Sequence, residues 1–331
     1  MCRSCDGCRP GPLSIALVLL FSNHRFPTTA FQPPHPLTAP RPEAAAVAAD
    51  AAEPSRTGTP TGTSPDGGAD VAAGWVCVEP LATAATIVEE RLRPPQPLPA
   101  PLPLRCWYAE PRNAVPRAGV LVLPEIFGIN RWVRSFSQRL ASAGYAALAM
   151  PLFARTAPDL ELGYTAEDTQ EGRRHKDLTS AAGILLDGAS ACAWLEQRLG
   201  RTGGLGCVGF CFGGHAALIS ALQPAIAATV DCYGAGVATG RPGGGPPSLE
   251  LVEAIEGRLL CLCGREDPLI PAAEVAAIGA ALAAAHHSPP HRLLELDAGH
   301  GFFCDQRDDY RPAAAAEGWN ELLNLFAESL G

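Results

Sequence analysis

From Trp75 onward, short apolar runs alternate with longer segments of helical spacing, and this alternation limits the fold more than any other feature. The run from Gly119 to Leu123 is apolar throughout, which is typical of a strand buried on both faces of a parallel sheet. Residues 131–143 follow with apolar side chains on one helical face and end at Gly144, in the position of a C-cap. The alternation predicts an α/β fold: a mostly parallel sheet with helices on both faces.

Composition narrows the choice of function. The formal net charge is −9, and the chain has no basic stripe to neutralise phosphates, so we expect no nucleic-acid partner. A core this large needs no disulfides, so most of the 12 cysteines are interpreted as small buried apolar residues.

The same alternation predicts the other elements of the domain. Further strands are expected at residues 84–89, 104–109, 145–150, 205–210, 228–232, 258–263 and 292–296. A further helix is expected at residues 212–222 and a surface loop at residues 240–247.

The first 74 residues differ in composition from the rest, and we predict that the folded domain covers residues 75–331. Residues 13–21 are an apolar run preceded by Arg3 and Arg9, which is typical of a signal-peptide core and too short to span a bilayer. The following segment, with Phe31, resembles the bipartite leaders that direct proteins to the plastids of some algae. Residues 32–74 are rich in Pro, Ala, Thr and Gly and predict a disordered linker. We expect a plastid protein with no span in its mature chain; a secreted protein, a cytoplasmic protein and a merely disordered or mispredicted amino terminus are the alternatives.

The strand at residues 205–210 runs through Gly209-Phe210-Cys211-Phe212-Gly213-Gly214 into a helix. This is the strand, sharp turn and helix of a nucleophile elbow, with cysteine in place of serine. Such a turn holds Cys211 at the positive end of a helix, where the dipole favours a thiolate. Cys211 is therefore the candidate nucleophile, and a buried structural cysteine is the alternative.

A thiolate nucleophile needs a histidine positioned by an acid, and in elbow enzymes the chain order is nucleophile, acid, histidine. Asp267 follows the strand at 258–263, and His300 lies in a Gly-flanked loop after the strand at 292–296. Parallel strands would bring both to the sheet edge that carries Cys211. The rival acid is Asp231, which lies one βα unit too early.

Four other histidines are weaker candidates for the catalytic base. His215 lies on the helix after Cys211 and suits a packing or capping role, whereas the others precede a strand and suggest surface residues. These others are His286, His287 and His291.

Four segments together resemble the dienelactone hydrolase family of α/β hydrolases. They are Leu123-Pro124-Glu125-Ile126-Phe127-Gly128-Ile129-Asn130, the Cys211 elbow, Gly264-Arg265-Glu266-Asp267 and Ala298-Gly299-His300-Gly301-Phe302, in the family's order across residues 80–329. The resemblance implies a triad of Cys211, Asp267 and His300. It also implies that Glu125 takes part in switching the cysteine to its thiolate, the alternative being a helix-capping acid. The backbone N–H groups of Ile126 and Phe212 then become donors for an oxyanion.

The family's substrates carry a carboxylate beside an enol lactone, held by two arginines. The segment Pro151-Leu152-Phe153-Ala154-Arg155 is similar to the family's first arginine segment, so Arg155 is the expected carboxylate ligand. The second arginine is expected four residues after the histidine, where this chain has Cys304; Arg307 and Arg311 are the candidates to replace it.

We therefore expect a hydrolase of activated esters or lactones that works through an acyl-enzyme, without cofactor. A thiolate leaves a tetrahedral intermediate more readily than an alkoxide or amide nitrogen, which favours enol esters, lactones and thioesters over peptides. A general carboxylesterase or thioesterase and a non-catalytic binding protein on the same fold are the alternatives. We expect a monomer and no metal, because Cys2, Cys5 and Cys8 lack a nearby fourth ligand.

Overall fold

The computed structural model describes residues 70–330, so residues 1–69, which hold the predicted leader, most of the linker and the first three cysteines, lie outside the described residues. The described part contains one sheet with the strand order β1-β2-β4-β3-β5-β6-β7-β8. The strands are β1 (Val71–Val78), β2 (Leu104–Pro111), β3 (Gly119–Leu123), β4 (Ala146–Ala149), β5 (Leu205–Phe210), β6 (Ile226–Cys232), β7 (Arg258–Gly264) and β8 (Arg292–Leu296). β2 is antiparallel to both neighbours, and the pairs from β4 to β8 are parallel, which confirms the predicted sheet.

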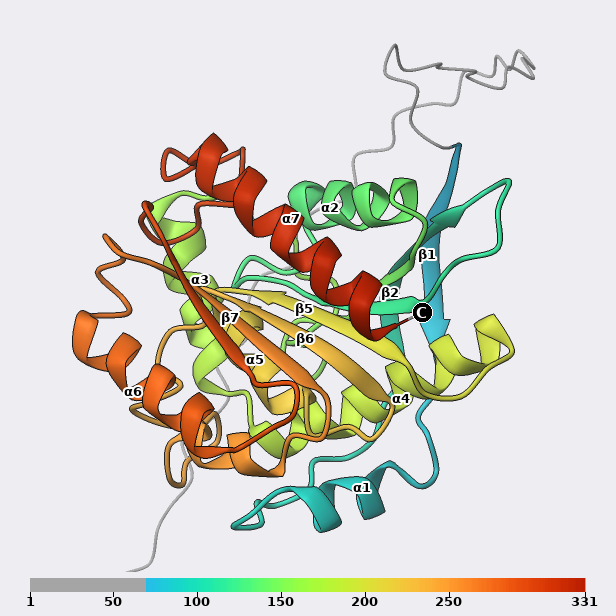
Figure 1. The fold of residues 1–331 in the computed structure, drawn as a ribbon. Coiled ribbons are helices and arrows are strands. Elements are labelled where there is room, and N and C mark those ends of the chain that lie inside the picture. Colours follow the sequence, from blue (N-terminus) through green and yellow to red (C-terminus); the bar gives the residue numbers. More distant parts are fainter. Residues whose placement is uncertain (1–69, 331) are drawn as a thin grey trace, which may run out of the picture. The chain divides into compact units, whose positions relative to one another are not determined.

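Helices cover both faces of this sheet (Figure 1). They are α1 (Ala84–Arg91), α2 (Arg131–Ser142), α3 (Ala166–Asp177), α4 (Ala181–Leu199), α5 (Phe212–Ser220), α6 (Ala272–Ala284) and α7 (Pro312–Ser329), with a short 3₁₀ helix η1 (Ser248–Ala254). In Figure 1, α2 and α7 lie on one side of the sheet, and α1, α4 and α6 lie on the other. Among residues 70–330 no single helix is long and apolar enough to cross a membrane; α3 and α4 pass that test only as a pair, bent by 91°.

The helix after β3 forms for the reasons that its sequence suggests. Asn130 is the N-cap of α2, and its side chain accepts a hydrogen bond from the N–H of Val133. The apolar face, with Phe136 and Leu140, is buried against the sheet. The chain leaves the helix at Gly144 with φ +96°, a left-handed conformation that glycine adopts without strain.

Two sequence predictions at the amino-terminal side are wrong. Residues 84–89, which were expected to form a strand and include the β-branched Thr86, Ile87 and Val88, lie in the helix α1. Ala84 and Val88 are four residues apart and both buried, so one helical face packs on α4 and outweighs the β-branched composition. The folded domain also begins before Trp75, because β1 starts at Val71 and pairs with β2 along its whole length.

Nine free cysteines lie within the described residues, and seven of them are buried, as predicted. The two exceptions are the exposed Cys77 and the partly exposed Cys211. Burial raises the pKa of most of these thiols, which keeps them protonated and unreactive.

Candidate active site

Cys211 stands on a sharp turn between β5 and α5. Its φ of 56° and ψ of −120° are unusual for a residue with a side chain. Glycines make the turn possible: a Cβ at Gly209 would lie 1.8 Å from the carbonyl oxygen of Gly213, and a Cβ at Gly213 would lie 2.3 Å from that of Leu123. The predicted elbow is therefore present.

Two backbone donors lie in the same cavity wall as the thiol. Phe212 is the first residue of α5, so its N–H has no partner within the helix. Ile126 lies in the turn between β3 and α2, and both residues line the cavity with Cys211. These are the two positions expected to stabilise an oxyanion.

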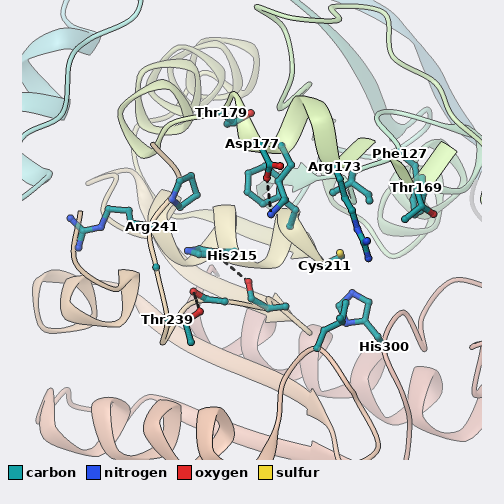
Figure 2. A pocket seen from close by; sticks show the side chains of 18 of the residues that line it. Phe127, Thr169, Arg173, Asp177, Thr179, Cys211, His215, Thr239, Arg241 and His300 are labelled. Atoms are coloured by element: carbon teal, nitrogen blue, oxygen red, sulfur yellow. Dashed lines mark hydrogen bonds and ion pairs between the residues drawn. The ribbon is translucent and has the colours of Figure 1, made fainter. Parts of the chain in front are cut away.

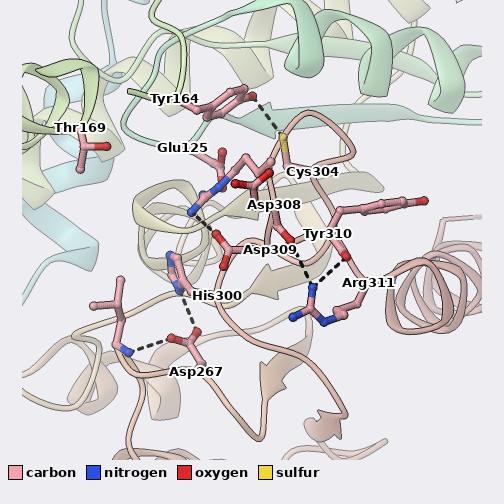
Figure 3. A network of polar contacts seen from close by, with 12 residues as sticks. Glu125, Tyr164, Thr169, Asp267, His300, Cys304, Asp308, Asp309, Tyr310 and Arg311 are labelled. Carbon is pink, nitrogen blue, oxygen red and sulfur yellow. Dashed lines mark hydrogen bonds and ion pairs between the residues drawn. The ribbon is translucent and has the colours of Figure 1, made fainter. Parts of the chain in front are cut away.

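His300 and Asp267 form a close pair at the same edge of the sheet. The Nδ1 atom of His300 lies 2.7 Å from Oδ2 of Asp267, whose carboxyl group is fully buried. The other carboxylate oxygen accepts a hydrogen bond from the N–H of Leu269 at 2.8 Å (Figure 3). Because a carboxylate accepts, Nδ1 carries the proton and Nε2 is left for the reacting groups.

The charge state of His300 depends on Cys211. Burial lowers the pKa of this histidine, but the negative charge of Cys211 and the hydrogen bond to Asp267 outweigh burial and raise the pKa to about 10. The Nε2 atom is buried and makes no hydrogen bond of normal geometry within residues 70–330. Catalytic hydrogen bonds often tighten only when substrate binds. The structure thus leaves Nε2 of His300 without a competing partner among residues 70–330.

Glu125 is buried and is held by Arg307. One carboxylate oxygen accepts from Nη1 of Arg307 at 3.0 Å, and the other, Oε2, is buried with no partner in the described chain. Burial raises the pKa of Glu125, although Arg307 and His300 oppose the shift. The N-cap of α2 is Asn130, so the capping alternative for Glu125 is wrong.

Of the two candidates for a second arginine, Arg307 lies in the cavity wall and Arg311 does not. Arg307 lines the cavity, whereas Arg311 donates to the carbonyl oxygens of Asp308 and Tyr310 (Figure 3). Cys304 is buried, and its thiol donates to the hydroxyl group of Tyr164 at 3.2 Å. Arg307 therefore stands beside Glu125 in spite of the cysteine at position 304.

The structure does not place Arg155, the predicted substrate ligand, in the cavity. Its guanidinium makes a bidentate ion pair with Asp187 on α4, at 2.6 and 2.8 Å, and also donates to the carbonyl oxygen of Ala100 at 3.2 Å. It is not among the residues that line the cavity. A buried carboxylate on a neighbouring helix is a stronger partner than solvent, and it turns the arginine away.

The weaker candidates have structural roles. Asp231 accepts a hydrogen bond from the N–H of Gly234 at 2.8 Å, and burial raises its pKa to about 7. His215 lines the cavity, but its ring bonds to the hydroxyl group of Ser248 at 2.7 Å, and burial lowers its pKa to about 4. The side chain of His287 bonds to backbone carbonyl oxygens.

The cavity at Cys211 has a volume of about 610 Å³ (Figure 2). Its apolar wall includes Phe127, Phe212 and Leu269. Another part of the wall comes from α3, which contributes Thr169 and cationic side chains that the sequence patterns did not predict. One signal for this helix was available: Thr165 and Asp168 form a capping box.

Comparisons with known proteins show the family and the fold of the chain. The family model described as "Dienelactone hydrolase family" matches residues 104–330. A Synechocystis protein named "Putative carboxymethylenebutenolidase" is 37% identical over 226 residues, covering 68% of this chain and 91% of the relative. A Bradyrhizobium protein named "Probable 2-oxo-3-(5-oxofuran-2-ylidene)propanoate lactonase" is 33% identical over 211 residues, 62% of this chain and 81% of the relative. The crystal structure of a "Putative Dienelactone Hydrolase" from Klebsiella pneumoniae has a TM-score of 0.65 at 26% identity, covering 78% of this chain and 99% of that one.

Proposed function

Because the chain belongs to the dienelactone hydrolase family, we propose that it hydrolyses lactones and activated esters through an acyl-enzyme on Cys211. The observation that carries this proposal is the set of groups at one sheet edge. A thiol on a strained elbow and a histidine bonded to a buried carboxylate line one cavity with two backbone donors. This is the arrangement that covalent acyl transfer requires.

The first half of the reaction forms the acyl-enzyme. The thiolate of Cys211 attacks the carbonyl carbon, a C–S bond forms, and the electron pair of the C=O double bond moves onto oxygen. The N–H groups of Ile126 and Phe212 stabilise this oxyanion. When the intermediate collapses, the C–O bond breaks and the leaving oxygen takes the proton from Nε2 of His300.

The second half releases the acid. Water gives a proton to Nε2 of His300 and attacks the thioester carbonyl carbon, and collapse of the second intermediate returns the thiolate. Asp267 keeps the proton on Nδ1 throughout and stabilises the imidazolium. Glu125 acts through charge: its buried carboxylate favours the imidazolium form of His300, and Arg307 limits that effect by pairing with it.

Burst kinetics with 4-nitrophenyl butyrate test the proposal on the full chain. We expect one equivalent of nitrophenolate in the burst and a butyryl adduct on Cys211 by peptide mass spectrometry. Cys211→Ala should abolish both signals. Cys77→Ala is the matched control, because that thiol is exposed and remote from the cavity lining, and it should leave both signals unchanged. A burst that persists in Cys211→Ala would refute the nucleophile.

We also propose that residues 1–74 address the protein to a plastid. The support is the apolar run at residues 13–21 and the sequence that follows it. A fluorescent protein fused behind residues 1–74 should accumulate in plastids of an alga with bipartite leaders. Fluorescence confined to the cytoplasm or the medium would contradict the address.

A further inference from the structure

Cationic side chains dominate the charged part of the cavity wall, although the chain is acidic overall. The cavity is lined by Arg173, Lys176, Arg241 and Arg307, and by a single carboxylate, Asp177. The chain's formal net charge is −9, so this local excess of positive charge is opposite in sign to the rest of the protein. A cleft of one charge attracts ligands of the other.

Three of these four cations are already bonded to the protein. The contacts are Lys176 Nζ with Asp177 Oδ1 at 3.2 Å, Arg241 with the carbonyl oxygens of Arg93 and Pro247 at 2.7 and 3.1 Å, and Arg307 with Glu125 and Asp309 at 3.0 and 3.1 Å. Arg173 makes no ion pair and no side-chain hydrogen bond with any residue from 70 to 330. Its guanidinium is therefore the cation of this wall that a ligand can engage without breaking a bond.

The backbone of Arg173 is fixed against the catalytic turn. A Cβ at the preceding residue, Gly172, would lie 2.4 Å from the carbonyl oxygen of Ile126, so only glycine permits this approach of α3. The capping box of Thr165 and Asp168 fixes the start of the same helix. These contacts hold residue 173 next to the turn that supplies an oxyanion donor.

The direction of the side chain agrees with that placement. In Figure 2, Arg173 extends from α3 toward Cys211 and His300, and all three residues line the cavity. The next residue, Arg174, makes two hydrogen bonds to Glu171 at 2.6 and 3.0 Å and does not line the cavity. Successive residues of a helix point about 100° apart, so the two arginines face different surroundings.

We propose that Arg173 is a specificity-determining residue that binds a carboxylate on the acyl part of the substrate, close to the scissile carbonyl. The inference rests on the proposed hydrolase function, and what it adds is the residue, because a carboxylate on the substrate is already expected from the family resemblance. A guanidinium matches a carboxylate through two parallel hydrogen bonds. Arg155 cannot supply this contact while it is paired with Asp187.

Two esters of matched acyl length test the assignment on the full chain. Mono(4-nitrophenyl) succinate carries a carboxylate where 4-nitrophenyl butyrate carries a methyl group, and both release the same phenolate. Arg173→Ala should lower kcat/KM for the succinate about 10-fold or more, the scale of a charge-assisted hydrogen bond, and leave the butyrate unchanged. Arg173→Lys should retain part of the preference, and raising the salt concentration should reduce it in the parent.

Arg174→Ala is the matched control, because it removes the same charge from the same helix. It should alter neither ester. Equal losses on both esters in Arg173→Ala would overturn the proposal and assign Arg173 to support of the catalytic centre. No loss on either ester would also overturn it.

Direct binding separates this proposal from the proposed reaction. Monomethyl succinate, titrated calorimetrically, reports on the carboxylate contact without turnover. Arg173→Ala should weaken its binding and Arg174→Ala should not, even if the protein hydrolyses neither ester. Unchanged binding in Arg173→Ala would refute the carboxylate contact, whereas binding without a burst on Cys211 would refute only the hydrolase mechanism.

Discussion

Arg155 offers the sharpest contrast between motif and structure, because its ion pair with Asp187 predicts a loss of stability where the motif predicts a loss of substrate binding. The carboxyl group of Asp187 is 6% exposed and the Arg155 side chain 26% exposed. Removing one partner of a buried pair costs about 3 to 5 kcal/mol, and the partial exposure of Arg155 places Arg155→Ala near the lower end. At 2 to 4 °C per kcal/mol for a domain of this size, the melting temperature should fall by roughly 6 to 12 °C.

The loss should depend on pH. Burial raises the pKa of Asp187 and Arg155 opposes the shift, so in Arg155→Ala the folded-state pKa rises further above the unfolded value near 4. An acid with a raised folded pKa loses stability as pH increases, because the unfolded chain releases its proton first. The destabilisation should therefore be larger at pH 7 than at pH 4.5.

Thermal unfolding of the parent, Arg155→Ala and the double variant Arg155→Met with Asp187→Leu measures this effect. The double variant should recover part of the stability, because no unpaired charge remains buried. The ratio of kcat/KM for the succinate and butyrate esters should stay at the parent value. An unchanged melting temperature together with a selective loss on the succinate would show that Arg155 binds substrate after all.

Three further predictions concern other buried groups and the domain boundary. Asp267→Asn removes a group that raises the pKa of His300, which is about 10 in the parent, so the alkaline limit of kcat/KM should move to lower pH. A limit that stays in place would contradict the pairing of Asp267 with His300. Burial raises the pKa of Asp231 from 3.8 in the unfolded chain to about 7 in the folded protein, so the free energy of unfolding should fall between pH 4 and 7 by at most roughly 4 kcal/mol. Asp231→Asn keeps the acceptor for the N–H of Gly234, so urea unfolding of this variant should show a flatter dependence on pH. Removing residues 1–69 should leave the melting temperature unchanged, whereas removing residues 1–78 deletes β1 and should lower it; equal melting temperatures would mean that β1 contributes nothing.

The sequence predicts the triad because its placement needs only strand order. Cys211, Asp267 and His300 each lie within four residues of the end of a strand, and the residues at the carboxyl ends of parallel strands meet at one edge of the sheet. Local pattern and tertiary position agree at these residues, so the structure brings them to one edge as expected, and their catalytic roles stay a prediction.

The arginines show where sequence reasoning stops. Arg155 has the expected motif, but its ion-pair partner, Asp187, lies 32 positions further along the chain. The residues around Arg155 in the sequence therefore do not predict this ion pair. Arg173 lies in a polar helix with no apolar stripe, and only the packing of Gly172 against Ile126 brings it to the cavity. The strand prediction for residues 84–89 fails for the same reason, because the contact of α1 with α4 favours a helix there.

The distribution of thiols makes Cys211 a natural target for selective chemistry. The other cysteines of residues 70–330 are buried, apart from Cys77, whose pKa is raised. Alkylating agents and peroxide react with thiolates in preference to thiols. One sulfur among residues 70–330 therefore combines solvent access with a cationic partner, and oxidation would act first on the residue that carries the proposed chemistry.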